Sequence, residues 1–443
     1  MWKVEIFLWK KVLLKNSETR SVEIHIFFHK RRGKVFLVKS RNFRVFHNPQ
    51  SLLLLTTIFI LSFSLRERKE RRFVMKLLCE KNTLVNAISI VSRTVSPKSS
   101  LAFLEGIYLA ADEDIRMTGY NLETGITVRI EAKVRESGEC VMPTRLFSEI
   151  VRKLPDDIVS IEVDENYRVN IKGGVASYHL IASAADEYPQ LPSVEEESAV
   201  RLPQNALRNL ISGTIFAVSD DTANPIYTGC LVEAEHESIT MVAIDGYRMA
   251  KRAWHQQGAA FPAMSFVVPS AALKELEKIL ESDEEKELRF TLGKKHISFE
   301  MDNATLICRL LEGKFAEWRR FIPASTPIQL VANVAELTAT VERVGLIVSE
   351  KYKSPVRCLF SKDGAEFRTV TTIASATDGC RLAGDGKDTE IGFSCRYMLE
   401  ALKAVPTEEV TLLLSGGLSP ILLVPCEGEE IDYTYLIQPV RLN

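Results

Sequence analysis

Residues 145–155 read RLFSEIVRKLP, and this pattern returns twice further along the chain. Within it, apolar side chains recur three or four positions apart, which is the spacing that gives an α-helix one apolar face. The two later copies are AALKELEKILES at 271–282 and RYMLEALKAVP at 396–406. A helix of the same kind at a near-constant interval predicts a structural unit of roughly 120–130 residues that is used three times.

The three short helical patterns share their leucines. Leu146, Leu273 and Leu399 are separated by 127 and 126 residues, so we expect them to occupy similar places in the three helices. Pro143 and Pro269 stand just ahead of the first two patterns. Proline suits that position because its fixed φ fits the passage from a strand into a helix.

A second helical pattern lies about sixty residues before each of these. In the first copy, TLVNAISIVSRTV, the side chains of Leu84, Ile88, Val91 and Val95 fall on one face. The corresponding patterns are ALRNLISGTIFAVS, which begins at Ala206, and AELTATVERVGLIVS, which begins at Ala335. Each unit therefore contains two amphipathic helices.

Between and after the helices the apolar period falls to two, which is typical of strands. Strand–turn–strand patterns occupy residues 158–173, 287–301 and 410–424. Each unit closes on a related phrase: DEYPQLP (186–192), AEWRRFIP (316–323) and LIQPVRL (436–442). A solenoid repeats at a shorter period. We predict an α+β fold of three similar domains, at 75–197, 198–325 and 326–443.

The first 74 residues are a different kind of sequence from the rest. They contain 17 Lys and Arg against 5 Asp and Glu, whereas residues 75–443 contain 39 and 53. Ser51–Leu65 is an uncharged run of 15, shorter than the about 20 apolar residues that a membrane-spanning helix needs. Three interpretations stay open: translation from a misplaced start upstream of Met75, a basic, partly ordered tail, or a membrane anchor. The first is favoured by the family resemblance described below, which begins abruptly at Met75.

The cysteines and the motifs exclude several classes of protein. None of the eight cysteines forms a C-x-x-C pair, and a disulfide framework is not expected in so large a chain. We expect a reducing cytoplasm and mostly buried thiols. No phosphate-binding loop, dinucleotide fingerprint or metalloprotease motif occurs, so no cofactor and no metal are predicted.

Several phrases together resemble the bacterial DNA polymerase III beta subunit, the beta sliding clamp. They are DEYPQLP, AIDGYRMA (243–250), KFAEWRRFIP (314–323), GFSCRYMLEAL (392–402), LSGGLSPILL (414–423) and the terminal QPVRL. Each phrase alone is weak, but their order and spacing are specific. The resemblance covers Met75–Leu442.

The resemblance implies a DNA clamp fold and a non-catalytic function. In this family each domain has two helices lining a central channel, with β-sheet on the outer rim. Two three-domain subunits join head to tail in a ring that encircles duplex DNA and is opened by an ATP-driven clamp loader. The clamp tethers the catalytic subunit of DNA polymerase III, other polymerases and repair factors through a Leu/Phe peptide.

A clamp has to hold DNA regardless of its sequence, which Lys and Arg achieve by contacting phosphates. The polar faces of the predicted helices supply such residues, although any one of them is equally explained as an ordinary solvated side chain. The candidates for the channel are Arg93, Lys98, Arg145, Arg152, Lys153, Arg208, Lys278 and Lys403, with Lys274, Arg343 and Arg396 on the same helices. The acidic balance of residues 75–443 would discourage DNA from binding the outside.

By resemblance, the partner peptide binds in a groove between the second and third domains. Apolar walls there would accept Leu and Phe anchors, with arginines and backbone groups at the rim. The second domain would contribute Tyr227, Ile244, Gly246, Tyr247, Arg248, Met249, Arg320 and Phe321. The third would contribute Leu418, Pro420, Gln438, Pro439, Val440, Arg441 and Leu442. Gly246 would permit a tight turn after Asp245, which is also explained as a simple hairpin turn.

Some positions depart from the family pattern. Ala316 and Trp318 stand where Pro and Tyr are usual, Gln438 replaces a usual Met, and residues 371–386 fit poorly. These departures leave the peptide preference open. Three rival functions are a hydrolase built on Asp245 and His255, a nucleic-acid-binding scaffold that forms no ring, and a membrane-associated scaffold.

Overall fold

The computed structural model describes residues 7–15, 21–31, 34–38, 73–99, 101–348, 354–362 and 364–442. The chain divides into two compact units, Met1–Arg71 and Arg72–Asn443. The first unit contains an antiparallel sheet of three strands, β1 (Phe7–Lys15), β2 (Ser21–Arg31) and β3 (Lys34–Val38). The apolar run Ser51–Leu65 lies outside the described residues. Among those that are described, no helix is both long and apolar enough to cross a membrane.

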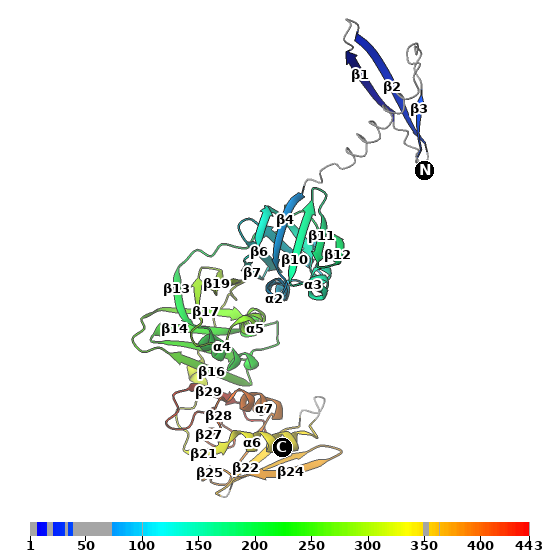
Figure 1. Cartoon of the computed structure of the whole chain (residues 1–443). Coiled ribbons are helices and arrows are strands. Elements are labelled where there is room, and N and C mark those ends of the chain that lie inside the picture. The colour runs from blue at the N-terminus through cyan, green and yellow to red at the C-terminus, as the bar shows by residue number, and fades with distance from the viewer. Residues whose placement is uncertain are drawn as a thin grey trace. The chain divides into compact units, whose positions relative to one another are not determined.

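The second unit contains three successive segments with the same order of elements (Figure 1). Each segment begins with a strand and a helix, continues through several strands to a second helix, and ends in three strands. In the third segment the C-terminal tail follows these strands. The helices are α2 (Lys81–Val91) and α3 (Thr144–Lys153), α4 (Gln204–Ser212) and α5 (Ser270–Ile279), and α6 (Val334–Gly345) and α7 (Cys395–Ala404). All six helices predicted from the sequence are therefore present.

The strands of the first segment are β4 (Phe73–Glu80), β5 (Gly106–Ala111), β6 (Ile115–Tyr120), β7 (Thr124–Ile130), β8 (Lys133–Glu136), β9 (Gly138–Pro143), β10 (Ile158–Asp164), β11 (Arg168–Gly173) and β12 (Ala176–Ile181). Those of the second are β13 (Ser198–Pro203), β14 (Gly229–His236), β15 (Ser238–Ile244), β16 (Arg248–His255), β17 (Phe261–Pro269), β18 (Glu287–Leu292), β19 (His296–Glu300) and β20 (Ala304–Arg309). Those of the third are β21 (Ile328–Asn333), β22 (Val356–Phe360), β23 (Ala365–Val370), β24 (Ser375–Cys380), β25 (Ala383–Gly384), β26 (Thr389–Phe393), β27 (Glu409–Leu414), β28 (Ile421–Val424) and β29 (Asp432–Ile437). The three predicted strand–turn–strand patterns are confirmed as β10–β11, β18–β19 and β27–β28.

One expectation about the short helices is wrong. Leu146 is 52% exposed on α3, whereas Leu273 is fully buried on α5, so the two leucines do not occupy similar places. Counted from the first residue of each helix, the equivalent buried residues are Phe147, Leu273 and Met398. The leucines were misaligned because the apolar face of α3 begins one position later, at an aromatic residue.

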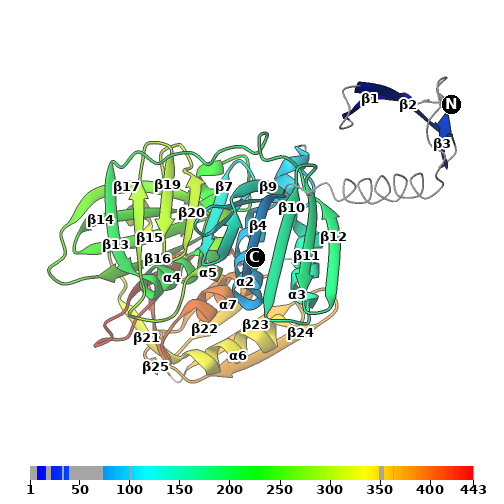
Figure 2. The same ribbon diagram turned by 45° about the horizontal axis from the view of Figure 1, so that its top comes forward.

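Two sheets run continuously from one segment into the next. An eight-stranded sheet has the order β13-β18-β19-β20-β7-β6-β5-β9, so β20 of the second segment pairs with β7 of the first. A nine-stranded sheet, β17-β14-β15-β16-β29-β28-β27-β21-β25, joins the second segment to the third through β16 and β29. Figure 2 shows β19, β20 and β7 following one another across the first of these boundaries.

The two remaining sheets of this unit belong to single segments. The order is β12-β11-β10-β4-β8 in the first segment and β24-β23-β22-β26 in the third. The helices pack against the sheets, α2 on β6 and β7, α4 on β15 and β16, and α6 on β23 and β24. The poorly fitting stretch 371–386 forms the hairpin strand β24 and the short β25.

The thiols are buried as expected. All cysteines except the half-buried Cys426 lie in the core. Burial raises the pKa of the Cys79 and Cys308 thiols to about 12, because a buried site disfavours the thiolate. These side chains therefore act as small apolar groups.

Candidate functional site

A tight turn marks the end of the β15–β16 hairpin at the joint between the second and third segments. Gly246 has φ +89°, and nothing lies within 4 Å of where a Cβ would be. Asp245 Oδ1 accepts hydrogen bonds from the backbone N–H groups of Tyr247 and Arg248, both at 2.9 Å. The predicted turn after Asp245 is present, and a carboxylate that caps its own turn holds it.

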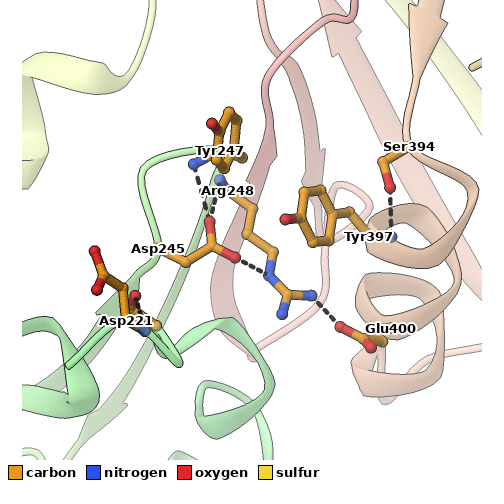
Figure 3. Close-up of polar contacts among 8 residues, drawn as sticks. Asp221, Asp245, Tyr247, Arg248, Ser394, Tyr397 and Glu400 are labelled. Atoms are coloured by element: carbon orange, nitrogen blue, oxygen red, sulfur yellow. Dashed lines mark hydrogen bonds and ion pairs between the residues drawn. The ribbon is translucent and has the colours of Figure 1, made fainter. Parts of the chain in front are cut away.

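Arg248 was expected near the rim of the groove, and the structure buries it instead. Its side chain is only 7% exposed. The guanidinium forms an ion pair with Asp245 (Nε to Oδ2, 2.9 Å) and a second with Glu400 of α7 in the third segment (Figure 3). Its Cζ lies 4.4 Å from the centre of the Tyr397 ring and 5.6 Å from that of Phe216. A planar guanidinium can pair with carboxylates at its edge while aromatic rings contact its face, so it can be buried here.

Tyr247 and Tyr397 form an aromatic wall beside this arginine (Figure 3). Their rings stack with centroids 6.5 Å apart at 24°, and Tyr247 is 66% exposed. The Ser394 hydroxyl caps α7 by accepting from the Tyr397 N–H. Tyr397 and Glu400 are site residues that sequence reasoning missed, although both lie within the family-like phrase 392–402.

The C-terminal tail, Gln438–Leu442, is held by backbone hydrogen bonds at its start and at its middle. The Gln438 N–H donates to Tyr247 O at 2.9 Å, and the Val440 N–H donates to Gly392 O at 2.8 Å. Leu442 is half-buried, whereas Arg441 is exposed and Val440 is 38% exposed. The tail is therefore seated on the third segment and does not fray from it.

An apolar cluster lies under the joint and draws on both segments. Its members from the second segment include Ile244, Met249 and Trp318, and those from the third include Leu422 and Leu436. The half-buried Tyr227 packs against this cluster, with its ring 5.4 Å from that of Phe315 in an edge-to-face arrangement. The structure thus brings together three predicted apolar residues of the second segment, Tyr227, Ile244 and Met249, with residues of the third segment that are remote in sequence.

An open cavity of about 580 Å³ borders the cluster along residues 313–320, and Leu231, Glu233 and Ser265 complete its lining. A smaller one of about 330 Å³ adds Phe321, which is 42% exposed. Trp318 lines the larger cavity and is itself buried, with its indole N–H donating to Glu233 at 3.3 Å. Among the predicted residues, only Arg320 and Phe321 line these cavities.

Leu418 and Pro420 lie on the loop between β27 and β28. Leu418 is 86% exposed, more than any other large apolar residue of this joint. Tyr247, Phe321, Leu418 and Val440 are thus four exposed apolar side chains around one joint. Exposed apolar groups gathered in this way mark an interaction surface.

The predicted cationic residues other than Lys98 lie at helix surfaces, but many are paired with carboxylates. Lys98 lies in the loop that follows α2 and not on the predicted helix face, because the helical structure ends at Thr94. Arg93 pairs with Glu275 of α5 at 3.4 Å, and Lys278 pairs with the same Glu275 at 2.8 Å. Arg208 is half-buried and donates to Ser282, whereas Lys98, Arg152 and Lys153 are exposed. The remaining pairs are Arg145–Glu149, Lys403–Glu342 and Arg343–Asp378, while Lys274 and Arg396 are exposed.

The rival hydrolase site is not assembled. Asp245 precedes β16 and His255 ends it, so the two side chains are separated by the length of an eight-residue strand. His255 instead contacts Asp432 at 3.1 Å, and Asp245 pairs with Arg248. Among the described residues, no group of three or more His, Cys, Asp or Glu side chains could hold a metal ion.

Comparison with known proteins agrees with this geometry. Residues 75–192, 201–317 and 319–441 match the family models of the N-terminal, central and C-terminal domains of the DNA polymerase III beta subunit. The beta sliding clamp of Halalkalibacterium halodurans is 30% identical over 381 residues, which is 83% of this chain and all of that protein.

Solved structures of similar proteins cover the same part of the chain. The DNA polymerase sliding clamp of Bacillus subtilis is 29% identical with a TM-score of 0.78, and the match covers 83% of this chain and 100% of that one. The sliding clamp of Pseudomonas aeruginosa bound to griselimycin is 25% identical with a TM-score of 0.79 and the same coverage.

Three α+β domains joined through shared sheets define a DNA clamp. The chain belongs to the DNA polymerase III beta subunit family, the beta sliding clamps, and its function is that of a DNA sliding clamp in replication.

Proposed function

We propose that the joint between the second and third domains is a groove that docks peptides of partner proteins. The single observation that supports this best is the gathering of four exposed apolar side chains, Tyr247, Phe321, Leu418 and Val440, around one joint. Such surfaces accept apolar anchors, and Leu and Phe side chains fit the mixed aliphatic and aromatic walls. The partners would be the polymerase catalytic subunit and other polymerases or repair factors with such a peptide.

The other predicted residues of the groove would have supporting roles. Ile244 and Met249 form its floor, Gly246 its turn, and Arg248 its buried brace. Arg320 and Arg441 remain exposed at the rim, where they could meet backbone or acidic groups of a peptide. Griselimycin, which is bound to the relative from Pseudomonas aeruginosa, is a suitable first probe of the site.

The groove can be tested by removing its C-terminal wall. Deletion of residues 438–443 should abolish binding of a labelled synthetic peptide with Leu and Phe anchors, because the Gln438 contact to Tyr247 and the Val440 side chain are lost together. Fluorescence anisotropy measures the affinity, and sedimentation checks that the subunit assembly is unchanged. Unchanged affinity after the deletion would show that the groove is elsewhere.

We further propose a closed ring of two subunits joined head to tail. In both joints within the chain, the last strand of one domain pairs with the third strand after the first helix of the preceding domain. These pairs are β20 with β7 and β29 with β16. By the same plan β12 is left for β24 of a partner subunit, since each lies at the edge of its own sheet. Unpaired edges of this kind invite strand addition, and repetition of one heterologous contact closes a ring when the rotation permits.

The exposed cations would face DNA in this ring. Lys98 and Lys153 are the most available candidates, because Arg93, Arg145, Lys278 and Lys403 are paired with carboxylates, and Arg152 and Arg208 with hydroxyls. Partly neutralised helix surfaces would attract phosphates weakly, which suits a protein that has to slide.

Retention on DNA distinguishes a ring from an adhesive scaffold. Residues 75–443 would be loaded onto nicked circular DNA by a bacterial clamp loader with ATP, and the circle would then be cut once. We expect release on linearisation, because topology and not affinity holds a ring. Persistence on linear DNA would favour the non-ring scaffold.

We place the protein in the cytoplasm as a non-catalytic accessory subunit, with domains at 75–197, 198–325 and 326–443. The first family match begins at residue 75 and the match to a relative covers all of that protein, which supports a clamp fold that begins there.

A further inference from the structure

The C-terminal tail rests on strand β26 at a position where no side chain fits. A Cβ added to Gly392 would lie 2.5 Å from Leu442 Cδ2 and 2.7 Å from the carbonyl oxygen of Val440. Real Cβ atoms do not approach backbone oxygens so closely, so the tail and a side chain at this position exclude each other. Gly392 is itself buried, and its carbonyl accepts the Val440 N–H.

The same backbone hydrogen bond exists in the other two domains, but different side chains surround it. Three residues before the second helix of each domain, a carbonyl accepts an N–H from the segment that follows the last strand. The acceptors are Val141, Val267 and Gly392, and the respective donors are Ser183, Leu311 and Val440, at 2.9, 3.0 and 2.8 Å. The backbone contact alone therefore tolerates a β-branched side chain. Only in the third domain does the segment also place Leu442 over the acceptor, and only there is the acceptor a glycine.

The second groove segment of this domain rests on the same strand. A Cβ at Gly417, next to Leu418, would lie 2.1 Å from the carbonyl oxygen of Glu390. Glu390 and Gly392 both belong to β26. The loop that presents Leu418 and the tail that presents Val440 are thus both seated on β26 by close backbone approach, which only glycine allows.

We propose that Gly392 is a positioning residue of the peptide groove, which seats the C-terminal tail on β26 and so holds the Val440 wall beside Tyr247. The inference rests on the proposed peptide docking. Gly392 itself need not touch the peptide. It acts through the tail, whose Gln438 N–H reaches Tyr247 O across the joint.

The test is Gly392→Ala in the whole chain, with two readouts. Hydrogen exchange should become at least tenfold faster at the Val440 amide, while amides of the β22–β26 ladder, such as that of Ile391, stay protected. The affinity for the synthetic peptide with Leu and Phe anchors should fall at least tenfold. A matched control is Gly125→Ala in β7, where the added methyl meets the end of the Leu191 side chain at the other joint. We expect it to leave peptide affinity within twofold.

Two results would overturn the inference: an unchanged Val440 amide, or a released tail with peptide affinity within twofold of the unmodified protein. If Gly392→Ala does not fold, Val440→Pro removes the same hydrogen bond from the side of the tail. Faster carboxypeptidase trimming and weaker peptide binding are then expected, and normal values for either would again overturn it. If the unmodified protein does not bind the peptide, the proposed groove itself is wrong. That outcome is distinct from a failure of the Gly392 inference, because it is seen without any substitution.

Discussion

The joint between the first and second domains and the joint between the second and third share one backbone plan. In the first, Asn121 Oδ1 accepts from the N–H groups of Glu123 and Thr124, at 3.0 and 2.7 Å. Asp245 Oδ1 makes the same two bonds in the second joint. The chain that crosses each joint then donates to the turn, Arg309 N–H to Glu123 O and Gln438 N–H to Tyr247 O.

The side chains of the two turns differ at every corresponding position. The turn at the first joint presents Leu122, with φ +74°, where the second has Gly246. Thr124 stands in place of the buried Arg248, and Glu123 in place of the stacked Tyr247. The first joint has an arginine–carboxylate pair of its own, Arg93 with Glu275 of α5 at 3.4 Å, but this arginine lies outside the turn and is 30% exposed, against 7% for Arg248. A repeated backbone therefore supplies the same turn geometry at both joints, and the side chains alone distinguish the joint that we propose to dock partners.

Removal of the buried arginine should produce the largest difference between the joints. Arg248→Ala leaves Asp245 and Glu400 without their partner, and we expect it to lower the free energy of unfolding by about 3 kcal/mol. Thr124→Ala, the matched change at the first joint, should cost about 1 kcal/mol. Urea unfolding of both variants measures the contrast. Equal losses would mean that the ion pairs do not stabilise the second joint.

Exchange of the turn residues tests the backbone plan itself. Gly246→Ala should destabilise the protein by about 1 kcal/mol, because φ +89° is unfavourable for a side chain even where space is open. Leu122→Gly should change stability by less than that, since relief of the left-handed backbone is offset by the greater freedom of glycine in the unfolded chain. Thermal unfolding gives both values. A neutral Gly246→Ala would indicate that the turn relaxes.

The smallest expected effect is a dependence of stability on pH in the acid range. Burial opposes ionisation of Asp432, but its ion pair with Lys251 and its contact with His255 outweigh burial and hold the pKa of Asp432 below its usual 3.8. Because the folded pKa is the lower one, this interaction stabilises the fold above pH about 4 and is lost as the pH falls through the folded value. The carboxylate is 40% exposed, so screening by water limits the contribution to less than about 1 kcal/mol.

Asp432→Asn should therefore lower the free energy of unfolding at pH 7, and by less at pH 3, which lies below the usual pKa of the carboxyl. Asn303 holds the corresponding place in the first joint and does not titrate, so Asn303→Ala serves as the pH-independent comparison. Urea unfolding at both pH values measures the two variants. A loss for Asp432→Asn that is equal at pH 3 and pH 7 would exclude a role for the charge.

Much of the fold could be predicted because it depends on local pattern. The six helices follow from apolar residues spaced three and four apart, and the hairpins from a period of two. The closing phrases also have a structural basis: Tyr188 and Trp318 are buried in corresponding segments of the first two domains. The misaligned Leu146 shows the limit, since periodicity does not distinguish a buried position from its neighbour at the margin of the apolar face.

The site was predicted less completely, because its residues act through contacts that are remote in sequence. Arg248 was expected near the rim, yet it is buried between a carboxylate three residues away and another 152 residues away. Tyr397 and Glu400 were missed for the same reason. A charged side chain can be buried only where partners are already in place, and no local pattern reports those partners.

By itself, the sequence determined three α+β repeats, the positions of their helices and hairpins, and the family to which they belong, because these depend on short-range periodicity and on ordered phrases. Only the tertiary structure decided which strands join the domains, that Arg248 braces one joint, and that the C-terminal tail lies on Gly392. The strand pairing and the Arg248 brace depend on contacts between segments more than a hundred residues apart. The position of the tail depends on how closely two backbones can approach. Both kinds of contact exist only once the chain has folded.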